Sequence, residues 1–238
     1  MQDKYLETNS ANYSPDESKR IFEYFYTIRS KYYLTILSLE QCNALFNAKR
    51  YTVVELMHVE MPRLQFSNSD LILARHSLEC FLFEAGSFLD MFMLYITLLL
   101  RLDFEGDMTR GKFFSTLRNA QKRKNAILPK VGLIEAYFNT KVFAEKSSEA
   151  APIREDWGKL LKELRNRVAH RDIIRVKPTD DVKVHGAILE DWPTLQSLHY
   201  NKFCEHISGA CFSLFEDLAP TLFDLDWKVG TCDPNAWD

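Results

Sequence analysis

The hydrophobic and polar positions of this chain follow a helical period over most of its length. Residues 14–17 (Ser-Pro-Asp-Glu) form a helix start, with Ser as the N-cap, Pro at the first position and Glu placed for a capping box. Apolar residues then recur from Ile21 towards Arg50, so we expect one long helix there. Segment 51–65 is ambiguous, because its Thr-Val-Val run suits either a strand or another helical turn, and Pro62 ends it.

A second cap cluster, residues 67–70 (Ser-Asn-Ser-Asp), begins a helix that we expect to reach about Leu100. Its apolar residues lie on most faces, which is typical of the central helix of a bundle. Two short β runs, 173–177 and 182–185, predict a small hairpin before the last helix. The other predicted helices are the basic segment 112–125, closed by Pro129, and the segments 133–143, 154–170 and 195–217, with Pro220 just beyond the last.

These elements predict an all-α fold, an up-down helical bundle with a long N-terminal helix and a small β-hairpin. The chain has 238 residues, 46% of them hydrophobic, with only 8 Gly and 8 Pro, which excludes collagen-like and low-complexity architectures. We see no internal repeat and no domain-sized linker. We therefore expect a helical extension, residues 1–66, that packs on a bundle domain of residues 67–238 to give one compact unit.

Composition also bears on the cellular compartment. The five cysteines are an odd number without the spacing of a disulfide framework, and the first ten residues are polar, unlike a signal peptide. In the most hydrophobic segment, 81–100, acidic residues interrupt the apolar run, and the part of the run without charges is too short to span a bilayer. We expect a cytoplasmic protein with no membrane contact.

Charge is distributed unevenly, although the chain as a whole carries a net charge of −3. Segment 108–134 holds seven basic residues and no acidic one. Such a helix can be simply a solvated face, or it can bind a nucleic-acid phosphate backbone. The candidate RNA-binding residues are those of this segment and two arginines further along the chain: Arg118, Lys122, Arg123, Lys124, Arg167 and Arg171.

Several catalytic classes lack sequence support. The chain has no P-loop, no dinucleotide-binding glycine motif, no G-x-S-x-G and no H-E-x-x-H. One Cys/His cluster (His199, Cys204, His206, Cys211) occurs on a predicted helix. At 100° per residue its cysteines and histidines fall on different faces, so that helix alone cannot build a tetrahedral zinc site. We expect neither a metal nor a cofactor.

The most informative segment is 164–172 (Leu-Arg-Asn-Arg-Val-Ala-His-Arg-Asp). On a helical wheel the leucines of this helix and Trp157 form one core stripe, with Arg165 at its flank. Asn166 and His170 are four residues apart on the opposite face, which points away from the core. No other Arg in the chain is followed by His at the fifth position. The pattern therefore presents Asn and His outward beside three arginines.

The run Arg165-Asn166-Arg167-Val168-Ala169-His170 resembles the R-[polar]-x-x-x-H signature of the HEPN superfamily. Members of this superfamily are α-helical bundles, many are metal-independent ribonucleases, and several act as toxins or antiviral effectors. Segment 74–84, followed by Phe88-Leu89-Asp90, is similar to the first core helix of such domains. The resemblance covers about residues 70–217, and the N-terminal helix lies outside it.

The residue types suit RNA cleavage without a metal, which needs a base for the 2′-hydroxyl and an acid for the leaving 5′-oxygen. His170 would be the acid or base, because the pKa of imidazole lies near neutrality. Arg165 would bind the charged transition state, and Asn166 would orient the imidazole or the phosphate. Glu79 and Asp90 would either support these residues or simply form ion pairs within the bundle.

One motif supplies only one imidazole, so two copies facing each other across a twofold axis would complete the site. The resemblance implies the same, since HEPN nucleases form a composite site at a dimer interface. We therefore expect a homodimeric endoribonuclease that leaves a 2′,3′-cyclic phosphate, a toxin or defence component with RNA as substrate and an antitoxin or regulatory protein as a further partner. Two alternatives stay open. One is a catalytically inactive HEPN-like dimer that binds RNA or a partner protein, and the other is a helical scaffold without nucleic-acid contact.

Overall fold

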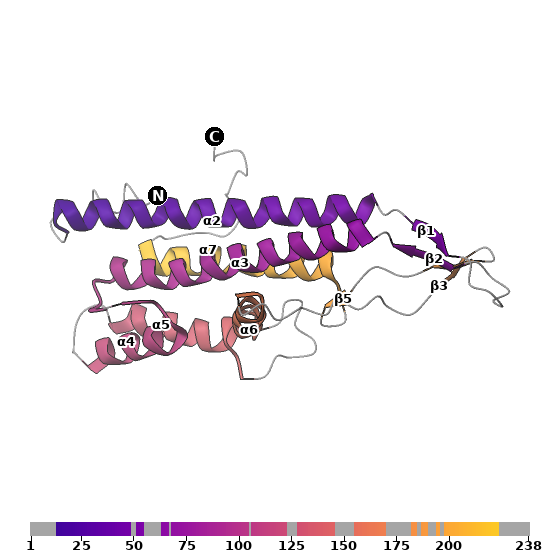
Figure 1. The fold of residues 1–238 in the computed structure, drawn as a ribbon. Helices are drawn as coiled ribbons and strands as arrows, with labels where there is room; N and C mark the ends of the chain where they lie inside the picture. Colours follow the sequence, from indigo (N-terminus) through magenta and orange to yellow (C-terminus); the bar gives the residue numbers. More distant parts are fainter. Residues whose placement is uncertain are drawn as a thin grey trace.

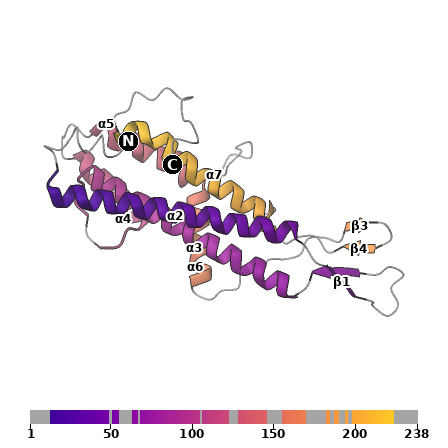
Figure 2. The ribbon, with the colours of Figure 1, turned by 90° about the horizontal axis from the view of Figure 1, so that it is seen from above.

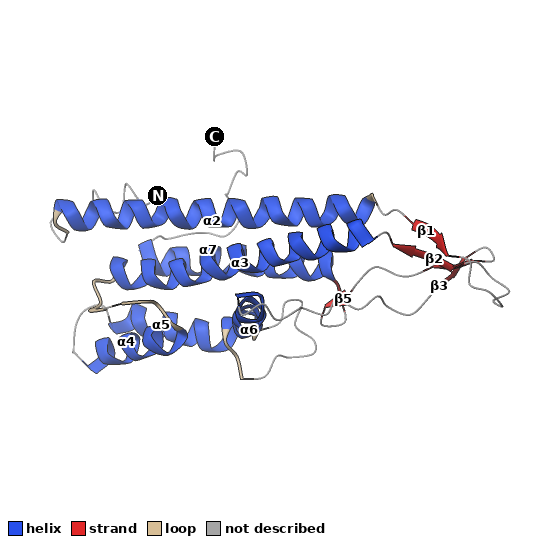
Figure 3. Cartoon of the chain, viewed as in Figure 1, coloured by secondary structure: helices blue, strands red, loops and turns tan. Residues whose placement is uncertain are grey.

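Helices make up most of the protein (Figures 1 and 3). The computed structural model describes residues 13–48, 51–54, 63–66, 68–104, 106–122, 128–145, 155–169, 182–184, 187–189, 194–195 and 198–223. The helices are α2 (Pro15–Asn47), α3 (Asn68–Leu99), α4 (Arg110–Lys122), α5 (Leu128–Tyr137), the π-helical turn η2 (Phe138–Val142), α6 (Trp157–Ala169) and α7 (Tyr200–Phe223). The strands are β1 (Tyr51–Val54), β2 (Arg63–Phe66), β3 (Val182–Val184), β4 (Ala187–Leu189), β5 (Thr194–Leu195) and β6 (Leu198–His199).

Helix α2 begins where the sequence predicts, because its first turn carries a complete capping box. The Ser14 side chain accepts a hydrogen bond from the Glu17 backbone N–H at 3.2 Å, and the Glu17 carboxylate accepts one from the Ser14 N–H at 2.7 Å. These two bonds satisfy backbone donors that the start of a helix leaves without partners. The helix then lies along α3 and also contacts α7, so the N-terminal segment contributes to the common core.

Helix α3 is the central helix. Its length and apolar composition would suffice to cross a membrane, but 67% of its apolar window is buried inside the bundle. This placement is that of the core helix of a bundle, as the sequence predicts. The helix ends at Leu99, and Arg101, two residues further on, adopts a left-handed backbone conformation (φ 52°). The Leu102 N–H then reaches the Thr97 carbonyl at 2.8 Å, and the Arg101 N–H reaches the Leu98 carbonyl at 3.0 Å, a Schellman ending.

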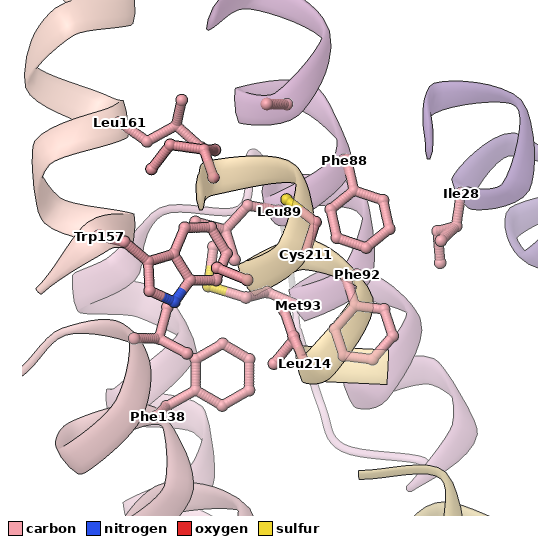
Figure 4. Close-up of a cluster of buried hydrophobic side chains, with 14 of the residues drawn as sticks. Ile28, Phe88, Leu89, Phe92, Met93, Phe138, Trp157, Leu161, Cys211 and Leu214 are labelled. Atoms are coloured by element: carbon pink, nitrogen blue, oxygen red, sulfur yellow. The ribbon is translucent and has the colours of Figure 1, made fainter. Parts of the chain in front are cut away.

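All the helices contribute buried residues to one core, and part of it lies between α3, α6, α7 and η2. Figure 4 shows side chains of these helices meeting around the α3 residues, with Ile28 of α2 at the edge of the cluster. Full burial of aromatic and aliphatic side chains is the main favourable term in such a fold, because each contributes about 1.5–3 kcal/mol when removed from water. The labelled core residues are Ile28, Phe88, Leu89, Phe92, Met93, Phe138, Trp157, Leu161, Cys211 and Leu214.

Helix α6 crosses the long helices instead of running alongside them. It is seen end-on in Figure 1 and lengthwise in Figure 2, where α2 and α3 run across the view. Its first turn can approach η2 closely because residue 158 is glycine. A Cβ at Gly158 would lie 2.6 Å from Val142 Cγ1 and 2.9 Å from Phe143 Cε1. The up-down arrangement predicted from the sequence therefore holds for α2 and α3, which run in opposite directions. It does not hold for α7, which is antiparallel to α2 and so runs in the same direction as α3, or for α6, which crosses them.

Four of the strands form a sheet at one end of the bundle, in the order β1-β2-β4-β3, and β5 pairs separately with β6. Strands β1 and β2 pair antiparallel, as do β3 and β4, and β2 joins β4 in parallel. The ambiguous segment 51–65 thus contains strands. The predicted hairpin pairs segment 182–185 with segment 173–177. In the structure, residues 182–184 pair instead with residues 187–189, which follow after two intervening residues. The first predicted run, 173–177, lies outside the described residues.

Two predicted helix boundaries at prolines are wrong. Pro129, which we expected to close α4, is the second residue of α5, a position where its missing N–H costs nothing. Pro220, expected beyond the last helix, lies inside α7, which also begins at Tyr200 instead of residue 195. The helix continues because Leu222 and Phe223 extend its buried face, and Pro220 removes only one backbone hydrogen bond near the end.

Candidate functional site

The candidate site lies on α6, whose two faces are separated as the sequence predicts. Its apolar stripe is buried, with Trp157 2% and Leu164 4% exposed, while Val168 is partly buried. The side chains of Asn166 and Arg167 are exposed on the opposite face. This amphipathic division fixes the rotation of the helix, because turning it would remove the stripe from the core. The polar face of the predicted motif is therefore directed to solvent over the residues described.

Unlike Asn166 and Arg167, whose side chains are exposed, Arg165 packs against α3. Its Nη1 donates a hydrogen bond to Oδ2 of Asp90 on α3 at 2.5 Å. Lys162 Nζ lies 3.0 Å from Oδ1 of the same carboxylate. The three side chains are 26%, 24% and 22% exposed for Arg165, Asp90 and Lys162. One carboxylate is thus held between two cations, and the cluster keeps one net positive charge.

The close packing of the Arg165 side chain against α3 depends on a glycine. A Cβ at Gly86 would lie 2.5 Å from Arg165 Cδ, so any larger residue there would displace the arginine stem. Further along the side chain, the guanidinium carbon lies 5.2 Å from the centroid of the Phe83 ring, within the range of a cation–π contact. Because Phe83, Gly86 and Asp90 are three or four residues apart, they share one face of α3. Together they form a fitted surface for Arg165.

An aromatic ring connects this cluster to the basic helix α4. The Phe143 ring has the Lys162 ammonium at 5.7 Å from its centroid and the Arg110 guanidinium at 5.0 Å. Both cations are therefore close enough for a cation–π interaction with the Phe143 ring, because the quadrupole of an aromatic ring attracts positive charge to its faces. Arg110 is the first residue of α4, so the positive groups of α4 and α6 belong to one region of the surface.

Helix α4 turns its basic residues outward. Phe113, Phe114 and Leu117 are buried, whereas Arg118 and Lys122 are exposed. Arg118 Nε bonds to the Phe114 carbonyl at 3.2 Å and lies 4.0 Å from a Glu135 carboxylate oxygen. The remaining charge of Arg118 is therefore reduced by a neighbour, while its side chain stays open to solvent. The other two predicted residues of this segment, Arg123 and Lys124, lie outside the described residues.

The structure separates the two acidic candidates. Asp90 contacts Arg165, as the expectation of a supporting residue requires, and it also forms an ion pair within the bundle. Glu79 instead pairs with Arg75, four residues earlier on α3, at 2.7 Å. His170 directly follows the last residue of α6 in the sequence, and both it and Arg171 lie outside the described residues.

The four Cys and His residues that we expected on one helix lie on two elements, because His199 belongs to β6 and the other three to α7. Cys204 and Cys211 are buried, His206 is exposed and His199 packs on the Phe46 ring at 5.7 Å. Burial raises the pKa of both thiols above the ordinary value, so they stay protonated at neutral pH. Among the residues that the structure describes, no three His, Cys, Asp or Glu side chains gather in a way that would hold a metal ion.

The sequence pattern does not identify Lys162, Phe83 and Gly86 as neighbours of the site. Gly86 and Asp90 are four residues apart, so a position without a side chain lies one helical turn before a carboxylate. This spacing is a weak signal that a side chain from another helix packs there. The partner, however, lies 75 residues away in the sequence, and only the packing of α6 across α3 identifies it.

Comparison of the chain with protein-family models, with curated proteins and with solved structures found no match.

Proposed function

We propose that the protein is a metal-independent endoribonuclease of HEPN type that acts as a homodimer with a composite site. The proposal is carried by one observation, which is that α6 directs Asn166 and Arg167 to solvent while Arg165, on the same helix, is fixed beside them. His170 follows within one residue of the described helix. A guanidinium, an amide and an imidazole on one short segment are the groups that metal-free phosphodiester cleavage requires.

The ion-pair cluster favours a role for Arg165 in binding an anion. A guanidinium has five donors, and the described hydrogen bond to Asp90 uses one of them. The carboxylate restricts the rotation of the side chain, so less conformational entropy is lost when a phosphate binds. Because Lys162 also neutralises Asp90, the cluster retains a positive charge for the transition state.

The surface around the cluster favours a polyanionic substrate. Arg110, Lys122 and Arg118 on α4 are exposed and continue the positive region that begins at Lys162. Each phosphate that such residues neutralise releases counterions, which makes binding of RNA strongly dependent on salt. Cytoplasmic location and a role as a toxin or defence effector with a protein antagonist are parts of the same proposal.

The test is cleavage of single-stranded RNA by the purified protein in the presence of a chelator. The proposal predicts chelator-resistant cleavage with products that end in a 2′,3′-cyclic phosphate. His170→Ala should abolish this cleavage with almost no change in thermal stability. His206→Ala is the matched control, because His206 is an exposed histidine on α7 that has no part in the proposed site. Cleavage at the wild-type rate by His170→Ala, or loss of cleavage on chelation, would contradict the proposal.

The exposed basic face of α4 also favours a second candidate, an inactive HEPN-like dimer that binds RNA without cutting it. This candidate predicts retention of RNA that weakens steeply with salt, together with the absence of turnover. Arg118→Glu with Lys122→Glu should reduce the retention and lower the slope of its salt dependence by about one for each lost contact. Turnover by the wild-type protein would decide in favour of the nuclease.

A further inference from the structure

Helix α2 has apolar residues on both of its sides. One side packs on the bundle through buried residues such as Ile21 and Ile28. Yet among the described residues eleven large hydrophobic side chains are exposed, and five of them lie on this single helix. An exposed apolar patch of this kind typically marks an interaction site. The exposed residues of α2 are Phe22 (39%), Tyr26 (50%), Tyr33 (52%), Leu34 (42%) and Leu37 (50%).

Four of these residues form a straight stripe. Phe22, Tyr26, Tyr33 and Leu37 fall within about 60° of one another on the helical wheel, and they span about 22 Å of helix. Lys19 and Glu40 continue the same stripe at its two ends, and both are exposed. The outward face of α2, hereafter the α2 stripe, therefore reads Lys19, Phe22, Tyr26, Tyr33, Leu37 and Glu40.

The α2 stripe is self-complementary under a twofold rotation. Suppose that two copies of α2 pack antiparallel, with the twofold axis passing between residues 29 and 30. Each residue then faces a residue of the other copy, and the two residue numbers add up to 59. Phe22 then faces Leu37 of the other copy, and Tyr26 faces Tyr33. The two ends carry opposite charge, so Lys19 faces Glu40. A twofold contact must match a surface with itself, and this pattern does so in both apolar and charged positions.

The side chains near the axis leave room for this approach. Ser30 is small and exposed. Arg29 leans along its own helix onto Tyr33, with Nη2 3.3 Å from the Tyr33 hydroxyl and the guanidinium carbon 5.4 Å from the ring centroid, so in the contact it would pack together with that ring. Lys19 has only a long contact with Glu23 at 3.9 Å, in which the side chains are 75% and 61% exposed, so it can turn to a better partner.

We propose that the α2 stripe is a docking surface for a second copy of this chain, with the two α2 helices antiparallel. The contact is independent of the proposed ribonuclease function. In Figure 1, α2 lies on the side of α3 away from α6, so docking through the stripe leaves the α6 face open. The composite nuclease site needs its own contact through α6.

Sedimentation velocity over a concentration series tests the proposal with reversed charges. Lys19→Glu alone and Glu40→Lys alone each place like charges opposite one another twice in the contact, and each should weaken self-association about tenfold at low salt. The double variant Lys19→Glu with Glu40→Lys restores both pairs, so its dissociation constant should return to within about twofold of wild type. Tyr26→Ser with Tyr33→Ser should weaken association at any salt concentration. Leu133→Ser, which changes an exposed apolar residue on α5, is the control and should have no effect.

Cross-linking tests the axis itself. In a background with Cys80→Ser and Cys232→Ser, which leaves only the buried cysteines, Ser30→Cys places a thiol beside its own copy, and a short bismaleimide should join two chains. Gln41 is also exposed, but Gln41→Cys would lie opposite residue 18 of the other copy, so it should give little cross-linked dimer. A wild-type protein that stays monomeric at its highest soluble concentration would overturn the proposal. So would self-association that none of the α2 variants alters, since that would place the contact elsewhere.

Discussion

Substitution of Asp90 tests the packing of α6 across α3, because its carboxylate on α3 forms ion pairs with Arg165 and Lys162 on α6. Asp90→Asn keeps the shape of the side chain and removes its charge. Arg165 and Lys162 would then remain close together, about three-quarters buried, without a counter-ion. Removing one partner of a fully buried pair costs about 3–5 kcal/mol, whereas an exposed pair is worth about 0–1 kcal/mol. For side chains that are about a quarter exposed we expect a loss of about 2 kcal/mol in the free energy of unfolding.

The assay is thermal and urea unfolding at neutral pH. A loss of about 2 kcal/mol corresponds to a fall in Tm of about 4–8 °C for a chain of this size. Glu79→Gln is the control, because its pair with Arg75 joins neighbouring turns of one helix and should be worth about 0.3–0.5 kcal/mol. In a double-mutant cycle, Asp90→Asn and Arg165→Gln should couple by more than about 0.5 kcal/mol. An Asp90→Asn variant as stable as Glu79→Gln, or additive effects in the cycle, would refute the account of this cluster.

Four other variants test the packing, the helix ends and the pH dependence. Gly158→Ala should lose about 1–2 kcal/mol, because its new Cβ would lie 2.6 Å from a valine methyl group. Gly132→Ala, a helical glycine with open space around it, should instead gain about 0.5–1 kcal/mol. Arg101→Gly should gain about 0.5–1 kcal/mol by relieving the left-handed conformation, since the ion pair that it loses is exposed. Hydrogen bonds from Ser14 hold the pKa of Glu17 below its ordinary value of 4.5, so Glu17→Gln should lower Tm at neutral pH and lose its effect as the pH falls below 4.5.

Each of these expectations has a clear contrary result. A Gly158→Ala variant as stable as Gly132→Ala would mean that α6 does not approach η2 as described. Destabilisation by Arg101→Gly would show that the side-chain contacts of Arg101 outweigh its backbone conformation. The carboxylate of Glu17 stabilises the fold only while ionised, so an effect of Glu17→Gln that grows in acid would contradict the capping geometry. All four are measured by differential scanning calorimetry or urea unfolding, the last at several pH values.

Local patterns in the sequence predict much of this fold, because the signals they use act over one or two helical turns. The Ser-Pro-Asp-Glu run at 14–17 identifies the start of α2, since a capping box involves only those four residues. The apolar stripe of α6 predicts its buried face for the same reason. The positions of Pro129 and Pro220 do not fix a helix boundary, because proline is compatible with both the first turn and the end of a helix, and the choice depends on packing.

Contacts between distant segments could not be predicted from the sequence. Strand β2 pairs in parallel with β4 across more than 120 residues, and short β runs do not specify their partners. The placement of Arg165 over Gly86 and beside Asp90 likewise follows from the crossing of α6 over α3, which no local pattern encodes. The sequence identified Asp90 as a candidate and placed Glu79 with it, although the two carboxylates have unrelated partners.

The most direct test of the composite site is RNA cleavage in chelator by wild-type protein mixed and re-equilibrated with increasing amounts of His170→Ala. If each site needs His170 from both subunits, mixed dimers are inactive, and cleavage per wild-type chain falls in proportion to the wild-type fraction, to about half in an equal mixture. Cleavage per wild-type chain that stays constant across the series would mean that each subunit works alone, and would contradict the account.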